Sequence, residues 1–245
     1  MSEQEALPRG RAFFRRRWEA NQLPASGVWQ MRRRLAEAMR SVVELLITSD
    51  APEEELRQAA LRLEDYAERL RQHPRRVRYL GFAETAVADE QPALDEAEGG
   101  GHFDFSPLIG RSNPLAPPIV LRSEEDTGRV HGSVVFGSAY EGPPGCVHGG
   151  YIAAAFDEVL GYAQTFSGSP GMTGTLTTVY RSPTPLHEEL CFEAWIERSE
   201  GRKVFCRGTL HAGARLCAEA DAIFVSMKPG VYARLARLRE RRGEP

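Results

Sequence analysis

The sequence has few cysteines, no long apolar run and no excess of basic charge. Its 245 residues include only four cysteines, without a CxxC pair or a histidine at zinc-ligand spacing, so neither a metal site nor a disulfide framework is expected. No segment approaches the roughly 20 apolar residues that a membrane-spanning helix needs, and the N-terminus lacks an apolar signal core. The net charge of -3 disfavours a nucleic-acid partner. We therefore expect a cytoplasmic protein without a metal, membrane or nucleic-acid partner.

Two helices are expected in the N-terminal third of the chain. From about Val28 to Thr48, apolar residues recur mostly at three- and four-residue intervals, the period of an amphipathic helix that packs against a partner. Asp50 is then expected to cap a second helix, with Pro52 in its first turn and Glu53 completing a capping box. Together the two segments predict a helical hairpin.

An acidic and then glycine-rich stretch separates this hairpin from the rest of the chain. It runs from about Gly81 to Gly101 and ends DEAEGGG, a composition that cannot bury enough apolar surface to fold by itself. We place a linker there. The predicted domains are residues 1–95, an N-terminal tail with the helical hairpin, and residues 96–245.

The second predicted domain alternates strand-like segments with one long helix. The helix, from Gly149 to about Phe166, has hardly any polar face, as a helix enclosed by protein should. An antiparallel sheet wrapped around such a helix is the hotdog architecture, so an α+β hotdog domain is expected. The strand-like segments, rich in β-branched and aromatic residues, are Ile119–Leu121, Arg129–Phe136, Thr173–Tyr180, Glu189–Ile196, Lys203–Leu210 and Leu216–Val225.

The segment from Pro143 to Glu158, PPGCVHGGYIAAAFDE, carries the residues that suggest chemistry. It places His148, Gly149 and Gly150 at the start of the long helix. A helix N-terminus presents unpaired N–H groups with partial positive charge, and glycines there let a ligand approach the backbone closely. A carbonyl oxygen on the Gly149 N–H would be polarised, so the helix start is a candidate oxyanion site.

Asp157 is the candidate base. It interrupts an apolar stretch, where burying a carboxylate without a partner is costly, so a specific role is indicated. A structural hydrogen bond to a neighbouring strand or loop is the alternative. Asp157 follows Gly149 by eight residues, about 12 Å along a helix axis, too far for one small reacting group to contact both. We therefore predict a homo-oligomer in which Gly149 of one protomer and Asp157 of another form each site.

Two motifs resemble those of one enzyme family. VHGGYIAAAFDE is similar to the HGGxxAxxxDE signature of PaaI-type hotdog thioesterases, and MTGTLTTVYRSPTPL, residues 172–186, resembles that family's T-x-x-L-x-x-x-Y-x-x-P-x-x-L strand. The resemblance covers roughly residues 107–228. It implies hydrolysis of acyl-CoA to free acid and coenzyme A by a homodimer or tetramer. It also implies no separate cofactor, because coenzyme A is part of the substrate.

Carried over by position, the resemblance assigns four catalytic roles. Asp157 would be the general base or the nucleophile, the Gly149 amide would polarise the carbonyl, Thr173 would help position the water, and His148 would orient the turn. Packing of a β-branched strand residue is the alternative for Thr173. Some relatives have an asparagine six residues before the histidine, where this chain has Gly142, so asparagine-assisted activation is absent or supplied differently.

Binding of the substrate is assigned to Gly150 at the helix start and to three cations. Arg181, Arg202 and Lys203 are candidates for the phosphates of coenzyme A, because guanidinium and ammonium groups suit exposed phosphate. A solvated hairpin turn is the alternative for Arg202 and Lys203.

Two other functions remain open from the sequence. One is a non-catalytic acyl-CoA sensor or scaffold whose N-terminal helices contact another protein. The other is a hotdog hydratase or dehydratase, which pairs a histidine with a carboxylate at a different spacing from that of His148 and Asp157.

Overall fold

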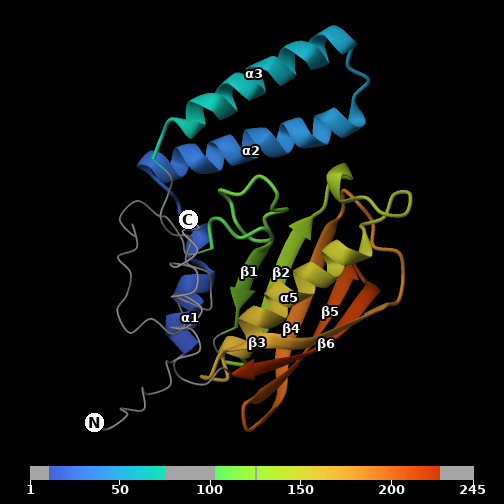
Figure 1. Ribbon diagram of the computed structural model, residues 1–245. Helices are drawn as coiled ribbons and strands as arrows, with labels where there is room; N and C mark the ends of the chain where they lie inside the picture. The colour runs from blue at the N-terminus through green and yellow to red at the C-terminus, as the bar shows by residue number, and fades with distance from the viewer. Residues whose placement is uncertain (1–10, 75–102, 125, 227–245) are drawn as a thin grey trace.

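One antiparallel sheet and one helix across its face form the centre of the molecule (Figure 1). The computed structural model describes residues 11–74, 103–124 and 126–226. The strand order is β1-β2-β4-β5-β6-β3. The strands are β1 Val120–Ser123, β2 Val130–Val135, β3 Gly171–Tyr180, β4 Glu189–Glu200, β5 Lys203–Ala212 and β6 Arg215–Ser226. The helices are α1 Arg11–Trp18, α2 Gly27–Thr48, α3 Glu53–Arg71 and α5 Gly149–Thr165, with 3-10 turns η1 Ala20–Gln22 and η3 Ser138–Tyr140. The predicted α+β hotdog fold is confirmed.

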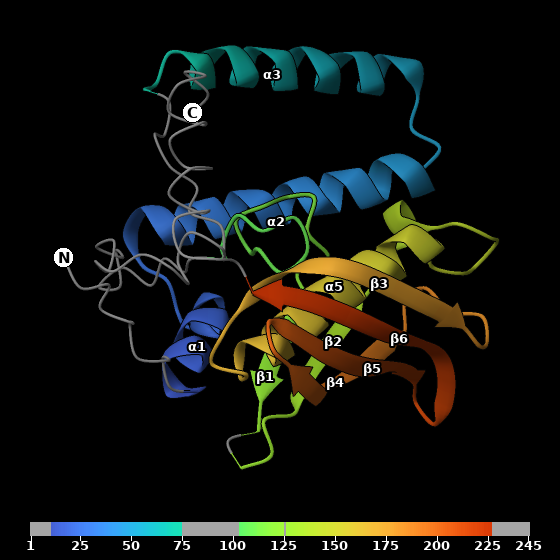
Figure 2. The same cartoon turned by 60° about the horizontal axis from the view of Figure 1, so that its bottom comes forward.

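The core forms where α5 lies against the sheet (Figures 1 and 2). On α5, Phe156 and Leu160 are fully buried, and the Phe156 ring meets Phe192 of β4 edge to face at 5.1 Å. A Cβ at Gly208 of β5 would lie 2.9 Å from the Glu193 carbonyl oxygen of the neighbouring strand β4 and 3.3 Å from Leu160 of α5. Glycine at this crossing is therefore required by close packing.

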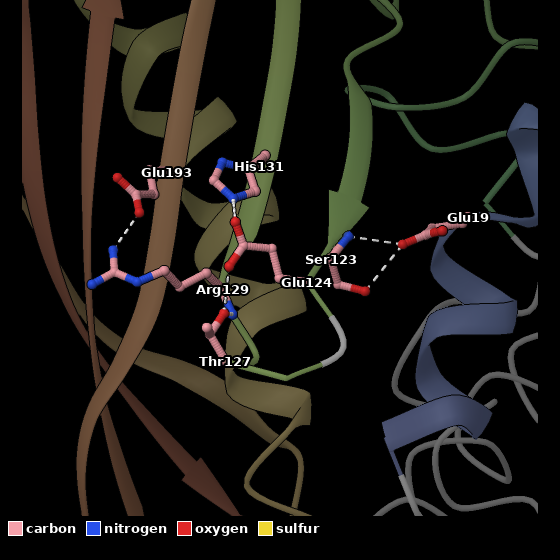
Figure 3. A network of polar contacts seen from close by, with 7 residues as sticks. All are labelled: Glu19, Ser123, Glu124, Thr127, Arg129, His131 and Glu193. Carbon is pink, nitrogen blue, oxygen red and sulfur yellow. Dashed lines mark hydrogen bonds and ion pairs between the residues drawn. The ribbon is translucent and has the colours of Figure 1, made fainter.

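The N-terminal helix α1 is part of this core. Its Trp18 is buried and stacks on Phe103 and on Tyr162 of α5, with ring centroids 4.3 and 5.0 Å apart. The Glu19 carboxylate accepts hydrogen bonds from the backbone N–H and hydroxyl of Ser123 at 2.9 and 3.1 Å (Figure 3). These contacts fix the N-terminal segment to β1, the edge strand farthest from β3.

The predicted helical hairpin is present as α2 and α3, which run antiparallel above the sheet domain (Figure 2). The helix α2 contacts that domain through Trp29, Arg33 and Ala36, its buried residues. Arg33 binds both carboxylate oxygens of Asp104, at 3.0 and 2.8 Å. The stripe of apolar residues that predicted the helix is largely exposed in this chain. The face that packs combines two apolar residues with the Arg33 ion pair, and a hydrophobic pattern does not reveal such a pair.

The start of α3 differs from the predicted one. Its N-cap is Pro52, without a side-chain cap bond, and the helix begins at Glu53. The prediction that Asp50 caps this helix is therefore wrong. The helix still has a favourable start, because the carboxylates of its first turn, Glu53, Glu54 and Glu55, lie at the positive end of the helix dipole.

The proposed linker and the boundary at residues 95 and 96 fall outside the described residues, so the two-domain division stays a prediction. Over the ranges that the structure describes, no helix combines the length and apolar character needed to span a bilayer. In those same ranges no three metal-binding side chains come together.

Candidate functional site

The turn before α5 exposes a backbone donor at the start of the helix. His148 is the N-cap, with extended backbone angles, and its Nδ1 accepts a hydrogen bond from the Gly150 N–H at 3.0 Å. The carbonyl of His148 accepts from Tyr151. Among the described residues, no acceptor lies within hydrogen-bond distance of the Gly149 N–H. This donor is available to a ligand, with the positive end of the α5 dipole behind it.

Tyr180 at the end of β3 fixes the first turn of α5. Its hydroxyl donates to the Gly149 carbonyl at 2.8 Å, and a Cβ at Gly149 would lie 3.1 Å from that hydroxyl oxygen. The sequence placed Tyr180 in the β3 motif without giving it a role. Its contact depends on α5 and β3 meeting at this end of the sheet, which no spacing along the chain reveals.

Asp157 lies on the exposed side of α5 and faces β3. The Thr173 hydroxyl donates to Asp157 Oδ1 at 2.7 Å, and both residues are exposed in the single chain. The β3 ladder is irregular immediately after Thr173, between Thr173 and Thr175, and such bulges redirect neighbouring side chains. The pair thus forms a polar site on the surface beside an edge strand, where water can reach it.

The neighbouring carboxylate, Glu158, is in a different environment. It accepts a hydrogen bond from the Ser106 hydroxyl at 3.0 Å. Burial raises the pKa of Glu158 from 4.5 to about 7, and the charge of Asp157 adds to this, while the Ser106 hydrogen bond opposes it. Of the two adjacent acids, Glu158 is half-buried beside a structural partner and Asp157 is open to solvent, so Asp157 is the one placed to act on a substrate.

Comparison with known proteins identifies the family. A family model described as the thioesterase superfamily matches residues 144–218. A solved structure of a thioesterase superfamily protein is 33% identical, with a TM-score of 0.69, and the match covers 83% of this chain and 97% of that one. The chain belongs to the thioesterase superfamily.

Two curated relatives of this thioesterase-superfamily chain are acyl-coenzyme A thioesterases THEM4. The Xenopus laevis protein is 38% identical over 95 residues, which are 38% of this chain and 43% of that protein. The Mus musculus protein is 34% identical over 91 residues, 36% of this chain and 39% of that protein. The chain therefore spans less than half the length of these curated relatives.

The structure of this superfamily member brings some predicted site residues together and separates others. His148, Gly149 and Gly150 share the start of α5, and Asp157 and Thr173 share one hydrogen bond. The two groups lie at different ends of the α5–β3 interface. The three predicted cations are likewise divided between the two ends: Arg181, Arg202 and Lys203.

Arg181 follows β3 at the helix-start end and forms an ion pair with Glu219 at 2.6 Å. Arg202 donates to the Ser226 carbonyl at 3.1 Å. Lys203 pairs in register with Val225, which pairs in turn with Met172 of β3, so it lies at the Thr173 end. One chain therefore does not gather these cations around a single ligand.

Gly142 occupies the position at which some relatives have an asparagine. A Cβ there would lie 2.7 Å from the backbone Cα of His148. Because backbone cannot move aside as a flexible side chain can, this turn has no room for an asparagine in its present form. Any activation of the carbonyl must come from other groups.

Glu158 makes the stability of this domain depend on pH. Its pKa in the folded chain is raised from 4.5 to about 7, so the folded state holds this proton more tightly. The contribution is fully present below about pH 4.5 and is lost as pH rises through about 7. We expect Glu158→Gln to match wild type in stability at pH 4 and to exceed it by about 2–3 kcal/mol at pH 8.

Urea denaturation at both pH values measures this difference. Glu64→Gln, the same change at an exposed site on α3, is the control and should show no such pH dependence. An advantage for Glu158→Gln that is equal at both pH values would contradict a half-buried Glu158 with a raised pKa.

Proposed function

We propose that this protein hydrolyses acyl-CoA thioesters to the free acid and coenzyme A. The observation that carries the proposal is the hydrogen bond between Thr173 and Asp157, which sets an accessible carboxylate beside a hydroxyl on the water-exposed side of α5. The substrate class follows from the names of the curated relatives.

In the proposed reaction, Asp157 takes a proton from a water molecule that Thr173 helps to hold. The water oxygen attacks the thioester carbonyl carbon, and the carbonyl oxygen gains negative charge on the Gly149 N–H. The carbon–sulfur bond then breaks, the thiolate of coenzyme A leaves with the proton that Asp157 took from the water, and the acid is released, which restores the Asp157 carboxylate. In the alternative, Asp157 attacks the carbonyl directly, and water hydrolyses the resulting anhydride to the same products.

A second copy of the chain completes the site in this proposal. Gly149 and Asp157 both belong to α5 and are about 12 Å apart along its axis, whereas a base and an oxyanion donor must each lie about 3 Å from the reacting groups. The strand β3 ends the sheet, and most of its residues are exposed. If the β3 strand of a second copy paired antiparallel with this edge, the Gly149 end of α5 in the second copy would lie beside Asp157 of the first copy.

The same arrangement accounts for the divided cations. Arg181 lies at the Gly149 end of β3, while Lys203 lies at the Thr173 end. Antiparallel pairing would set Arg181 of one protomer near Arg202 and Lys203 of the partner subunit. The phosphates of coenzyme A would then meet cations from two chains, which agrees with a site shared between subunits.

Thiol release tests this function. The wild-type protein is assayed against short-chain, long-chain and aromatic acyl-CoAs and against an enoyl-CoA, with free coenzyme A detected by a thiol reagent and loss of the enoyl group followed separately. Release of stoichiometric thiol and acid is expected for at least one class. Binding of acyl-CoA without turnover would favour the sensor, and consumption of an enoyl-CoA with no thiol release would favour a hydratase.

A further inference from the structure

A cavity of about 620 Å³ lies under α2, at the edge of the sheet opposite β3. Its walls come from η1, from α2, from the loop that precedes β1, and from β1 itself. Five arginines and one acid line it: Arg33, Arg34, Arg40, Arg111, Arg122 and Glu37.

Two of these arginines have their charge compensated. Arg33 is buried and forms a two-point ion pair with Asp104. Arg40 pairs with Glu37 at 2.6 Å and also donates to the Asn113 carbonyl at 3.0 Å. These contacts hold α2 against the loop, so their role is structural.

The side chains of the other three arginines make no contact that stabilises the described part of the chain. Arg34 on α2, Arg111 in the loop and Arg122 on β1 have exposed side chains. Their guanidinium groups form no hydrogen bond, ion pair or ring contact with any residue in the described part of the chain. Each comes from a different element, so the folding of the chain brings them to one cavity.

This arrangement is unfavourable for the protein alone. Like charges that share one partly enclosed cavity repel each other, and the repulsion is stronger where the walls exclude water. Apolar residues of the same cavity, Ile109, Pro118 and Ile119, form such walls. The overall charge of the chain is -3, so the cavity is a local positive region on an otherwise acidic protein.

We propose that this cavity binds a ligand that carries two phosphate groups. A bisphosphate has about three to four negative charges at neutral pH, which matches three uncompensated guanidinium groups. Arginine is the side chain best suited to it, because its planar fork donates two parallel hydrogen bonds to one phosphate. The cavity volume lies within the usual range of small-molecule sites, about 300–1,000 Å³.

The site is separate from the proposed catalytic centre and does not rest on the proposed function. The strands β1 and β3 are opposite edges of the six-stranded sheet, with four strands between them. Ligand bound beside Arg122 would therefore contact neither Asp157 nor Thr173.

Calorimetric titration of the full chain with inorganic pyrophosphate at low salt tests the proposal. Wild type should bind pyrophosphate, with inorganic phosphate weaker and with affinity falling as salt is added. Arg34→Gln, Arg111→Gln and Arg122→Gln should each weaken binding about ten-fold, the loss expected for one charge-assisted contact, and the triple variant should not bind. Because these side chains are exposed and unpaired, the variants should fold as wild type does.

Two controls separate this site from general charge effects. Arg62→Gln, on the exposed surface of α3, removes one positive charge elsewhere and should leave binding unchanged. The double variant Arg57→Gln with Arg71→Gln, at two other exposed positions of α3, removes two positive charges there and should also bind normally. Absence of binding by wild type, or equal losses in Arg62→Gln and the three cavity variants, would overturn the proposal.

Two further probes identify the source of the phosphates. Adenosine bisphosphate represents a soluble ligand, and vesicles containing phosphatidylinositol bisphosphate represent a lipid headgroup. Binding of either one that is lost in the triple variant supports the site and names the source. Binding that the triple variant retains in full would place these ligands elsewhere and count against it.

Discussion

Asp157→Asn is expected to lower the rate of thiol release from acyl-CoA by about 10²- to 10⁴-fold, the usual contribution of a positioned acid–base group. Asparagine keeps the size of the side chain and an oxygen that can accept the Thr173 hydrogen bond. It cannot take a proton from water or act as a carboxylate nucleophile. Because Asp157 is exposed and makes this bond at the surface of α5, the thermal unfolding temperature should change little.

The matched control is Asp65→Asn, which makes the same substitution at an exposed position on α3 and removes an ion pair with Arg69. Its rate should equal that of wild type. Single-turnover measurements with saturating enzyme separate the chemical step from substrate binding. A variant at position 157 that hydrolyses at the wild-type rate would exclude Asp157 from the reaction, whichever of its two proposed roles is considered.

Much of the fold could be predicted because its elements follow regular patterns. The helix predicted from Gly149 to about Phe166 spans Gly149–Thr165, since an apolar stretch between a glycine-rich start and a turn defines both ends. The predicted β4 ended at Ile196, but the strand continues to Glu200. Its last residues are polar and exposed, so they lack apolar alternation and are held instead by ladder pairing with β5.

Without the family resemblance, the site was predictable only where its residues are near in sequence; the resemblance added Thr173, which lies on another element than Asp157. The His148 cap and the free Gly149 donor belong to one turn, and their roles follow from helix geometry. Tyr180, which contacts Gly149, and the cavity arginines depend on segments far apart in the chain coming together. The Arg33 pair with Asp104 is a similar case, because a buried ion pair leaves no periodic signal in the sequence.

Gly149→Pro is expected to lower the rate by about 10²- to 10³-fold, because it deletes the oxyanion donor. Proline is tolerated here for two reasons. First, Gly149 is the first residue of α5, where the backbone N–H has no partner within the helix. Second, His148 already has extended backbone angles, φ -60 and ψ 131, which the residue before a proline favours. Gly149→Ala is the control, since it adds the same Cβ beside Tyr180 but keeps the N–H, and it should retain most of the activity.

Combining the two inactive variants then tests whether subunits share sites. In a dimer of one Asp157→Asn chain and one Gly149→Pro chain, a shared arrangement gives one site with both native groups and one site with neither. Dimers purified through two different tags should therefore regain about half of the wild-type rate, as the symmetry of a two-site dimer requires. Sites contained within single chains would stay inactive in every combination, so verified mixed dimers without activity would show that Gly149 and Asp157 do not act across a subunit boundary.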